Sequence, residues 1–269
     1  MIRMKPLDQL SSADAQRVRY VLTDIDDTVT TDGRLTAGAY RALEQLDQAG
    51  ILVIPITGRP AGWCDHIARM WPVFAVVGEN GAFYMRYDRS ARKMITHHWA
   101  EQASRQLNRI KLNQLSEEIL KSVPGSALAS DQSYREADLA IDFCEDVPPL
   151  PESEVTRIVD MFKQAGAHAK VSSIHVNGWF GDYDKLSMTR TLFAREFGCR
   201  LENVLDEALF IGDSPNDEPM FGFFRLSVGV ANVRALIHRI QDKPVFVTAG
   251  YGGDGFAEMA ARLLESRGQ

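Results

Sequence analysis

Carboxylates at the end of one apolar stretch are the first side chains in this sequence that could do chemistry. Asp24, Asp26 and Asp27 directly follow the mainly apolar run at 20–23, which predicts a buried strand. Several unpaired like charges beside a core strand are costly. Mg2+ prefers oxygen ligands and usually takes one or two protein carboxylates. The pattern therefore indicates a divalent-cation site, and the alternative is an Asp-rich turn that caps the next helix.

Polar residues recur at three later places that each end an apolar stretch or begin a predicted helix. These places are Thr57 with its two successors, Lys185, and the pair Asp213 and Asp217. Each has an ordinary explanation when it is taken alone. Thr57 could cap a helix, Lys185 could be a solvated surface residue, and the two acids could favour a helix dipole.

The elements that must position these residues alternate along the chain. Apolar runs predict strands and helical spacing predicts helices, in an order typical of an α/β protein with right-handed crossovers and a parallel sheet. Ligands of such sheets bind at the carboxyl ends of the strands, which is where the acids lie. The predicted strands are 20–23, 51–56, 74–77, 208–211, 226–230 and 245–247, and the predicted helices are 36–49, 60–70, 185–197, 233–240 and 256–264.

The pattern changes between residues 100 and 180. Helices at 101–123 and 154–166 alternate there with short strands, of which the last two form a pair at 168–173 and 174–180. We interpret 100–180 as an inserted α+β domain, and 1–99 with 181–269 as the α/β core.

Composition excludes several classes of function. The 269 residues are 45% hydrophobic, which suffices for a real core, and the net charge of -6 gives no general basic footprint for nucleic acid. Three cysteines without CxxC spacing disfavour a zinc site or a disulfide framework and suit a reducing compartment. The sequence contains no apolar run of about 18 residues, so we predict no membrane span. We expect a cytoplasmic protein that forms a monomer or a small homo-oligomer.

Taken in this order, the four places resemble the motif set of the haloacid dehalogenase (HAD) superfamily. DIDDT at 24–28 matches the first motif, DxDxT, and ITGRP at 56–60 matches the second. DYDKLSM, which contains Lys185, matches the third, and GDSPND at 212–217 matches the fourth. The insertion lies between the second and third motifs. Its αββαββ order is similar to the C2-type caps of subgroup IIB, the Cof-type proteins. ENGA at 79–82, VGVANVRALI at 228–237 and GYGGDGFAEM at 250–259 also resemble that subgroup.

The resemblance implies a Rossmann-like parallel sheet with a C2-type cap and a Mg2+-dependent phosphomonoesterase. Asp24 would be the nucleophile that forms an aspartyl-phosphate. Asp26 would be the general acid and then the base, and would offer the metal only its backbone carbonyl. Asp24 and Asp213 would supply carboxylate ligands, with Asp217 and Asn216 further from the ion, although Asp217 could ligate directly.

The remaining motif residues would serve the phosphoryl group. Thr57, beside Gly58, would hydrogen-bond a phosphoryl oxygen, Lys185 would neutralise its charge, and Thr28 would fix the loop. The sequence departs from the family at Asp27 and at the residue after Lys185, where relatives often carry glycine. Lys170, inside the cap, is a substitute for Lys185 that no family motif supports.

The chemistry itself needs these residue types. The loose transition state of phosphoryl transfer requires positioning and neutralisation of charge. A carboxylate nucleophile splits hydrolysis into two easier steps, and the leaving alkoxide needs a proton from a second acid. Asp24 and Asp26 are two apart, so in an extended segment both point the same way. Asp26 argues against a dehalogenase, because cleavage of a carbon-halogen bond needs no such acid.

The cap should select the substrate, which we expect to be a small phosphorylated metabolite. GDSPND and the cap type are similar to sucrose-phosphate and mannosyl-3-phosphoglycerate phosphatases, which suggests a sugar phosphate only by analogy. Trp179 would suit stacking on a sugar, and Asn177 and His175 would suit its hydroxyls. The cap residues that could read the leaving group are Arg135, Lys170, His175, Asn177 and Trp179.

Two other functions stay open. A phosphosugar mutase is suggested by NGWFGDYDK at 177–185, which faintly resembles eukaryotic-type phosphomannomutases. A mutase needs a cationic site for a second phosphate, and the predicted cap strands offer mainly Arg135, which disfavours it. A non-catalytic metabolite-binding protein on the same scaffold is the second alternative, and the intact motifs argue against it.

Overall fold

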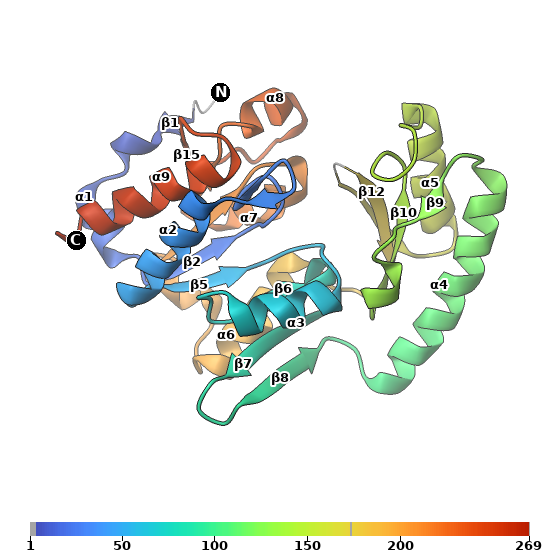
Figure 1. The fold of residues 1–269 in the computed structure, drawn as a ribbon, viewed down its shortest axis with the longest axis horizontal. Helices are drawn as coiled ribbons and strands as arrows, with labels where there is room; N and C mark the ends of the chain where they lie inside the picture. Colours follow the sequence, from blue (N-terminus) through green and yellow to red (C-terminus); the bar gives the residue numbers. More distant parts are fainter. Residues whose placement is uncertain (1–3, 173, 269) are drawn as a thin grey trace.

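A six-stranded parallel sheet forms the centre of the larger of two units in the computed structural model, which describes residues 4–172 and 174–268 (Figure 1). Every pair of neighbouring strands in this sheet is parallel. The strands, in their order across the sheet, are β1 (Lys5–Pro6), β15 (Phe246–Val247), β14 (Leu226–Gly229), β13 (Ala208–Gly212), β2 (Tyr20–Thr23) and β5 (Leu52–Pro55). The predicted parallel sheet is confirmed, and β1 adds an edge strand where we predicted none.

Helices cover both faces of this sheet because consecutive strand residues point to opposite faces. Val21 and Val53 pack with residues of α2 and α9, whereas Leu22 and Ile54 pack with residues of α6 and α7. The helix predicted at 233–240 is shorter than expected and continues as a 3-10 turn. The helices are α1 (Ser12–Arg17), α2 (Ala37–Gln48), α3 (Ala61–Met70), α6 (Lys185–Glu196), α7 (Glu218–Phe223), α8 (Val233–Leu236) and α9 (Gly252–Glu265).

The strand predicted at 74–77 runs parallel to β5 and the residues that follow it, but it is not one of the six strands of the parallel sheet. The backbone N–H of Phe74 donates to the carbonyl of Val53 in β5 at 2.9 Å, and an isolated parallel bridge joins Ile56 and Val77. Glu79 and Asn80 adopt left-handed φ angles of 43° and 57°, so the chain turns back at once into an antiparallel hairpin. The strands of this antiparallel sheet are β6 (Val76–Gly78), β7 (Phe83–Asp88) and β8 (Lys93–His98), and a separate small hairpin is made by β3 (Thr30–Thr31) and β4 (Arg34–Leu35).

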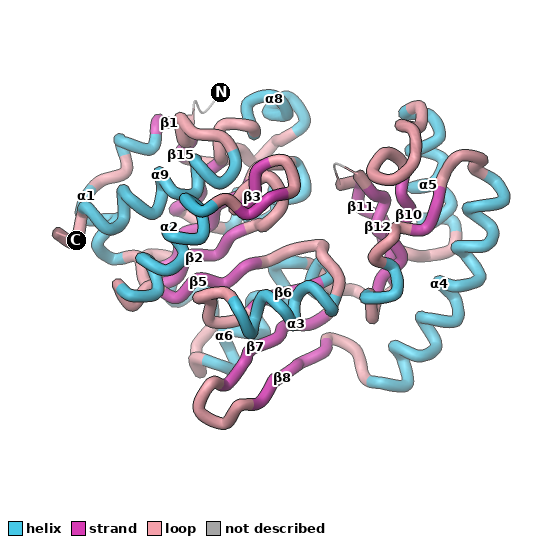
Figure 2. The backbone as a smooth tube through the Cα atoms, in the orientation of Figure 1, coloured by secondary structure: helices cyan, strands magenta, loops and turns pink. Residues whose placement is uncertain are grey.

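The smaller unit, which we call the cap, has an antiparallel sheet with two helices on one face. Figure 2 shows α4 and α5 on the side of this sheet away from the larger unit, which we call the core unit. Ile141, Phe162 and Val176 belong to the hydrophobic cluster between this sheet and these helices. The cap elements are α4 (Gln102–Ser122), β9 (Ala127–Leu128), β10 (Asp138–Asp142), α5 (Glu152–Gln164), β11 (His168–Val171) and β12 (His175–Trp179).

The other face of the cap sheet is polar and is directed toward the core unit. In the register of the sheet, Asn177 pairs with Lys170 on one side and His175 pairs with Asp142 on the other. The predicted order of cap elements agrees with the structure, and residue 173 of the strand predicted at 168–173 lies outside the described residues. None of the helices in the described ranges is both long and apolar enough to cross a membrane.

Candidate active site

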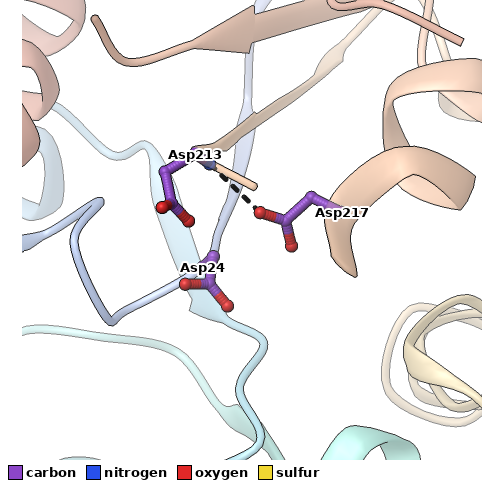
Figure 3. Close-up of side chains that lie close together, drawn as sticks. All are labelled: Asp24, Asp213 and Asp217. Carbon is purple, nitrogen blue, oxygen red and sulfur yellow. Dashed lines mark hydrogen bonds between the residues drawn. The ribbon is translucent and has the colours of Figure 1, made fainter. Parts of the chain in front are cut away.

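Three aspartates converge where two neighbouring parallel strands end. Asp24 follows β2 and Asp213 follows β13, and the backbone N–H of Asp24 donates to the carbonyl of Ile211 at 3.0 Å. Asp217 ends the 3-10 turn that leads into α7. One carboxylate oxygen of each aspartate lies within 4.8 Å of the others (Figure 3). Asp24 and Asp217 are buried, so this cluster of carboxylates lies inside the protein.

Lys185 is the cation that faces this cluster. It is the first residue of α6, and its Nζ donates to Asp24 Oδ1 at 2.7 Å and to Asp217 Oδ1 at 2.9 Å. Its side chain is buried as well. The structure therefore brings together Asp24, Lys185, Asp213 and Asp217, whereas the substitute Lys170 lies on β11 in the cap.

The second carboxylate oxygen of Asp217 stabilises the loop that carries Asp213 through backbone hydrogen bonds. Oδ2 accepts from the backbone N–H of Asp213 at 3.1 Å, drawn dashed in Figure 3, and from that of Ser214 at 3.4 Å. A Cβ at position 212 would lie 2.4 Å from this oxygen, so the carboxylate can approach only because Gly212 has no side chain. The distance of four residues between Asp213 and Asp217 in GDSPND is therefore the one that lets the Asp217 carboxylate close this turn.

The electrostatics of the cluster favour a bound cation. Burial raises the pKa of Asp24 to about 8, and burial together with the neighbouring carboxylates raises the pKa of Asp213 well above its usual range. Lys185 acts in the opposite direction on both aspartates, yet one ammonium group cannot balance three carboxylates. The donor atoms are all oxygens, which suits a hard divalent ion such as Mg2+. The residues present therefore fit the group that the motifs imply.

Asp26 has a partner that the motif analysis did not assign. Arg59 Nε lies 3.0 and 3.1 Å from the two carboxylate oxygens of Asp26, and Arg59 Nη2 lies 2.8 Å from Oδ1. The guanidinium also lies 4.7 Å from the ring centre of Trp63, and its Nη1 is 3.9 Å from Asp131 in the cap. ITGRP already placed Arg59 beside the site, but only the fold shows which acid it contacts.

The other residues predicted for the phosphoryl and metal site are Thr57, Thr28, Gly58 and Asn216. Thr57 is buried and its Oγ1 accepts from the backbone N–H of Arg59 at 3.0 Å. Thr28 is buried, and its hydroxyl has no hydrogen-bond partner among the residues that the structure describes. Gly58 and Asn216 line the cavity described below.

The backbone conformation of Asp27 explains why aspartate can stand where many relatives carry glycine. Its φ of 55° lies in the left-handed region, where glycine is free of strain and aspartate is one of the residues that tolerate it. Its carbonyl accepts from Asn232 Nδ2 at 2.7 Å, and Asn232 Oδ1 accepts from the backbone N–H of Gly252 at 3.1 Å. Asn232, which we did not predict, therefore ties the first acidic loop to the start of α9. In the sequence, the VGVANV stretch that contains Asn232 was the feature that could have pointed to it.

A cavity of about 1040 Å³ extends from this cluster to the cap. Its walls come from both units, so a molecule bound at the aspartates would also contact the cap. The polar side chains of the core in its lining include Asp24, Asp26, Asp213, Asn216, Asn232 and Arg239. Those of the cap include Arg135, Lys163, Lys170, His175 and Asn177.

Four of the five predicted cap residues line this cavity, and Trp179 does not. Burial lowers the pKa of His175, whose Nε2 lies 2.8 Å from Glu145 Oε2. Asn177 Nδ2 donates to Asp138 Oδ2 at 3.2 Å. Trp179 is buried, stacks on Tyr183 at 5.8 Å and donates its indole N–H to the Tyr183 carbonyl. We therefore withdraw the suggestion that Trp179 stacks on a sugar.

The guanidinium of Arg135 is already occupied by protein partners, so it is poorly placed to contact a substrate. It is buried, and its guanidinium contacts Asp131 at 3.0 Å and Asp138 at 3.0 Å. Its Nη1 also donates to the carbonyl of Gly58 in the core unit at 3.1 Å. The side chain thus joins the cap to the loop of the second motif.

Comparison with known proteins agrees with this geometry. Residues 21–121 match a family model described as haloacid dehalogenase-like hydrolase. A solved structure from Thermoplasma acidophilum has a TM-score of 0.70 at 18% identity, covering 92% of this chain and 98% of that one. A putative HAD/COF-like hydrolase from Plasmodium vivax has a TM-score of 0.67 at 17% identity, and the alignment covers 95% of this chain and 99% of that one.

A third similar structure is the sucrose-phosphatase from Synechocystis sp., solved in complex with sucrose and phosphate. Its TM-score is 0.62 at 16% identity, and the alignment covers 92% of this chain and 98% of that one. A search of curated proteins gave no match. At these identities the solved structures show a shared fold over nearly the whole chain.

Proposed function

We propose that this chain is a haloacid dehalogenase-like hydrolase, and specifically a Mg2+-dependent phosphomonoesterase that acts on a small sugar phosphate; the family match over residues 21–121 and the shared fold support this. The observation that carries the proposal is the buried contact of Lys185 with Asp24 and Asp217, with Asp213 beside them, at the end of a cavity shared with the cap. A phosphoryl group needs this combination of a carboxylate nucleophile, a cation and a metal site.

Asp24, Asp213 and Asp217 are the residues that would hold the metal ion, together with the backbone carbonyl of Asp26. When bound, the ion screens the repulsion between the Asp24 carboxylate and the phosphoryl oxygens. Lys185 adds a fixed positive charge to the same place. Its position does not depend on the ion, because Nζ is held by two carboxylates.

The chain's own residues divide the reaction into two displacements. Asp24 attacks phosphorus through a carboxylate oxygen, and the bond from phosphorus to the leaving oxygen breaks. Asp26, which takes up a proton from solvent once it has left Arg59, gives that proton to the leaving oxygen. Asp26 then takes a proton from a water molecule that attacks the aspartyl-phosphate, which releases phosphate and restores the Asp24 carboxylate. Asp26 must leave Arg59 to reach the leaving group, so opening of this ion pair belongs to the cycle.

The cap supports a sugar as the leaving group. Lys170, His175 and Asn177 line the cavity from the polar face of the cap sheet, where they offer donors and acceptors to hydroxyl groups. The name of one similar protein, sucrose-phosphatase, points in the same direction. The mutase is less well supported, because Arg135 is already paired with Asp131 and Asp138 and is not free for a second phosphate.

A phosphate-release assay tests the proposal. The purified protein should hydrolyse p-nitrophenyl phosphate and members of a panel of sugar phosphates with Mg2+, and EDTA should stop it. It should do so without a bisphosphate activator, which a mutase would need. Absence of any Mg2+-dependent release across the panel would favour the non-catalytic alternative.

A further inference from the structure

Glu79 is a fully buried carboxylate whose hydrogen bonds join the core unit to the cap. It follows β6 in the core, and it is 0% exposed. Oε1 accepts from the backbone N–H of Ala61 at 2.9 Å and from that of Glu136 at 2.8 Å. Oε2 accepts from the backbone N–H groups of Ala137 at 2.6 Å and Asp138 at 3.1 Å. Three of these four donors are successive residues of the cap.

These bonds are well suited to fix the cap in place. Hydrogen bonds to a carboxylate are shorter and stronger than those between neutral groups. Ala61 opens α3, so the helix dipole adds to the attraction for the negative charge. The three cap donors lie where the chain enters β10, and a buried N–H without a partner is costly. Removing the carboxylate would therefore leave several donors unsatisfied at once.

The turn that carries Glu79 also touches the catalytic elements. A Cβ at Gly58 would lie 3.2 Å from the side chain of Asn80. A Cβ at Gly81 would lie 2.1 Å from the carbonyl of Asp184, so this glycine allows the turn to contact the residue before Lys185. The turn at Glu79–Gly81 thus lies between the entry to the cap sheet and the start of α6.

We propose that Glu79 is a positioning residue that seats the cap over the active site. By holding residues 136–138, it places Arg135 on the Gly58 carbonyl and directs the polar face of the cap sheet toward the aspartates. The seating of the cap stands on these contacts alone, and its effect on turnover rests on the proposed function. The competing explanation is that Glu79 only stabilises the start of α3.

Hydrogen exchange followed by mass spectrometry separates the two explanations without any activity measurement. Residues 136 and 137 lie outside every strand, so protection of their backbone N–H groups in the wild type should depend on Glu79. Glu79→Gln should make a peptide that contains 136–138 exchange at least about tenfold faster. Residues 209–211 of β13 should keep their rates.

Glu196→Gln is the matched control. Glu196 is a partly buried glutamate of the core whose carboxylate contacts Tyr84 Oη at 2.7 Å and Arg86 Nε at 2.8 Å, with no contact to the cap among these bonds. It should leave exchange at 136–138 unchanged. Equal exchange in wild type and Glu79→Gln, or rapid exchange at 136 and 137 in the wild type, would overturn the proposal.

A kinetic comparison adds a second readout. Glu79→Gln should lower kcat/KM for a sugar phosphate about tenfold more than for p-nitrophenyl phosphate, whose small leaving group depends less on the cap. Glu79→Asp keeps the charge and should recover part of the loss, and it replaces the Gln variant if that variant does not fold. Uniform losses on both substrates would contradict a positioning role. If the wild type hydrolyses no phosphate ester, the proposed function fails, whereas the exchange result still decides whether Glu79 seats the cap.

Discussion

Lys185 Nζ lies 2.7 Å from Asp24 Oδ1, although 161 residues separate the two in sequence. Asp24 precedes the insertion and Lys185 follows it, and both are buried. Their contact exists because β2 and α6 belong to the same layered core, with the entire cap inserted between them. The proposed nucleophile, Asp24, and the lysine that contacts it are therefore positioned by the core and not by the cap.

Replacing the nucleophile should abolish turnover and preserve the fold. We expect Asp24→Asn to lower the rate of phosphate release by at least about 10³-fold, because an amide cannot form the covalent intermediate. The amide retains the size of the carboxylate and removes one of several crowded negative charges. Asp65→Asn, at an exposed aspartate of α3, is the matched control and should keep full activity. Wild-type rates in Asp24→Asn would show that the nucleophile is misassigned.

The role of Asp26 predicts a dependence on the leaving group. We expect Asp26→Asn to lose about 10²- to 10⁴-fold on sugar phosphates, whose alkoxide needs a proton, and much less on p-nitrophenyl phosphate. Steady-state kcat values on both substrates measure the difference. Equal losses on the two would argue that Asp26 acts only through its contact with Arg59.

Loss of Lys185 should destabilise the metal-free protein. Lys185→Met leaves three neighbouring carboxylates without their cation, and breaking a buried ion pair from one side costs about 3 to 5 kcal/mol. Denaturant unfolding in EDTA at pH 8 measures this loss, and excess Mg2+ should restore part of it. Lys121→Met, at an exposed lysine at the end of α4, should change the free energy of unfolding by less than about 0.5 kcal/mol. A similar small change in Lys185→Met would contradict the buried pairing.

The stability of the metal-free protein should fall as pH rises from 6.5 to 8. The pKa of Asp24 is raised by burial from its ordinary 3.8 to about 8, so over this range the folded state holds a proton that the unfolded state has lost. Each increase in pH then favours unfolding, by on the order of 1 to 2 kcal/mol in total. Burial lowers the pKa of His175 from its ordinary 6.5, so its opposite effect is strongest below pH 6.5 and fades above it.

Urea unfolding in EDTA at several pH values measures this slope. Saturating Mg2+ should reduce the slope, because the ion favours the ionised carboxylates. Asp24→Asn should make it shallower without abolishing it, since burial also raises the pKa of Asp213 and raises that of Glu79 to about 7. A rise of stability between pH 6.5 and 8 in the metal-free protein would contradict the raised pKa.

Much of the core could be predicted because its signals are local. A continuous apolar run such as that at 51–56 indicates a strand covered on both faces, and the acids after β2 and β13 sit at chain positions that any parallel sheet brings to one edge. The strand at 74–77 also lies parallel to the chain of β5, but its ladder is with β7, because the left-handed turn at Glu79 and Asn80 redirects the chain. The backbone conformation of two residues is not visible in an apolar pattern.

The sequence by itself determined which residues are the candidates to carry the chemistry, because motif spacing follows from strand ends and helix starts, which are short-range properties of the chain. Only the tertiary structure decided the partners of those residues. Asp26 pairs with Arg59, Glu79 accepts from the cap, and Trp179 is covered by Tyr183 instead of facing the cavity. These contacts depend on how the cap packs against the core, and that packing depends on side-chain directions in both units at once.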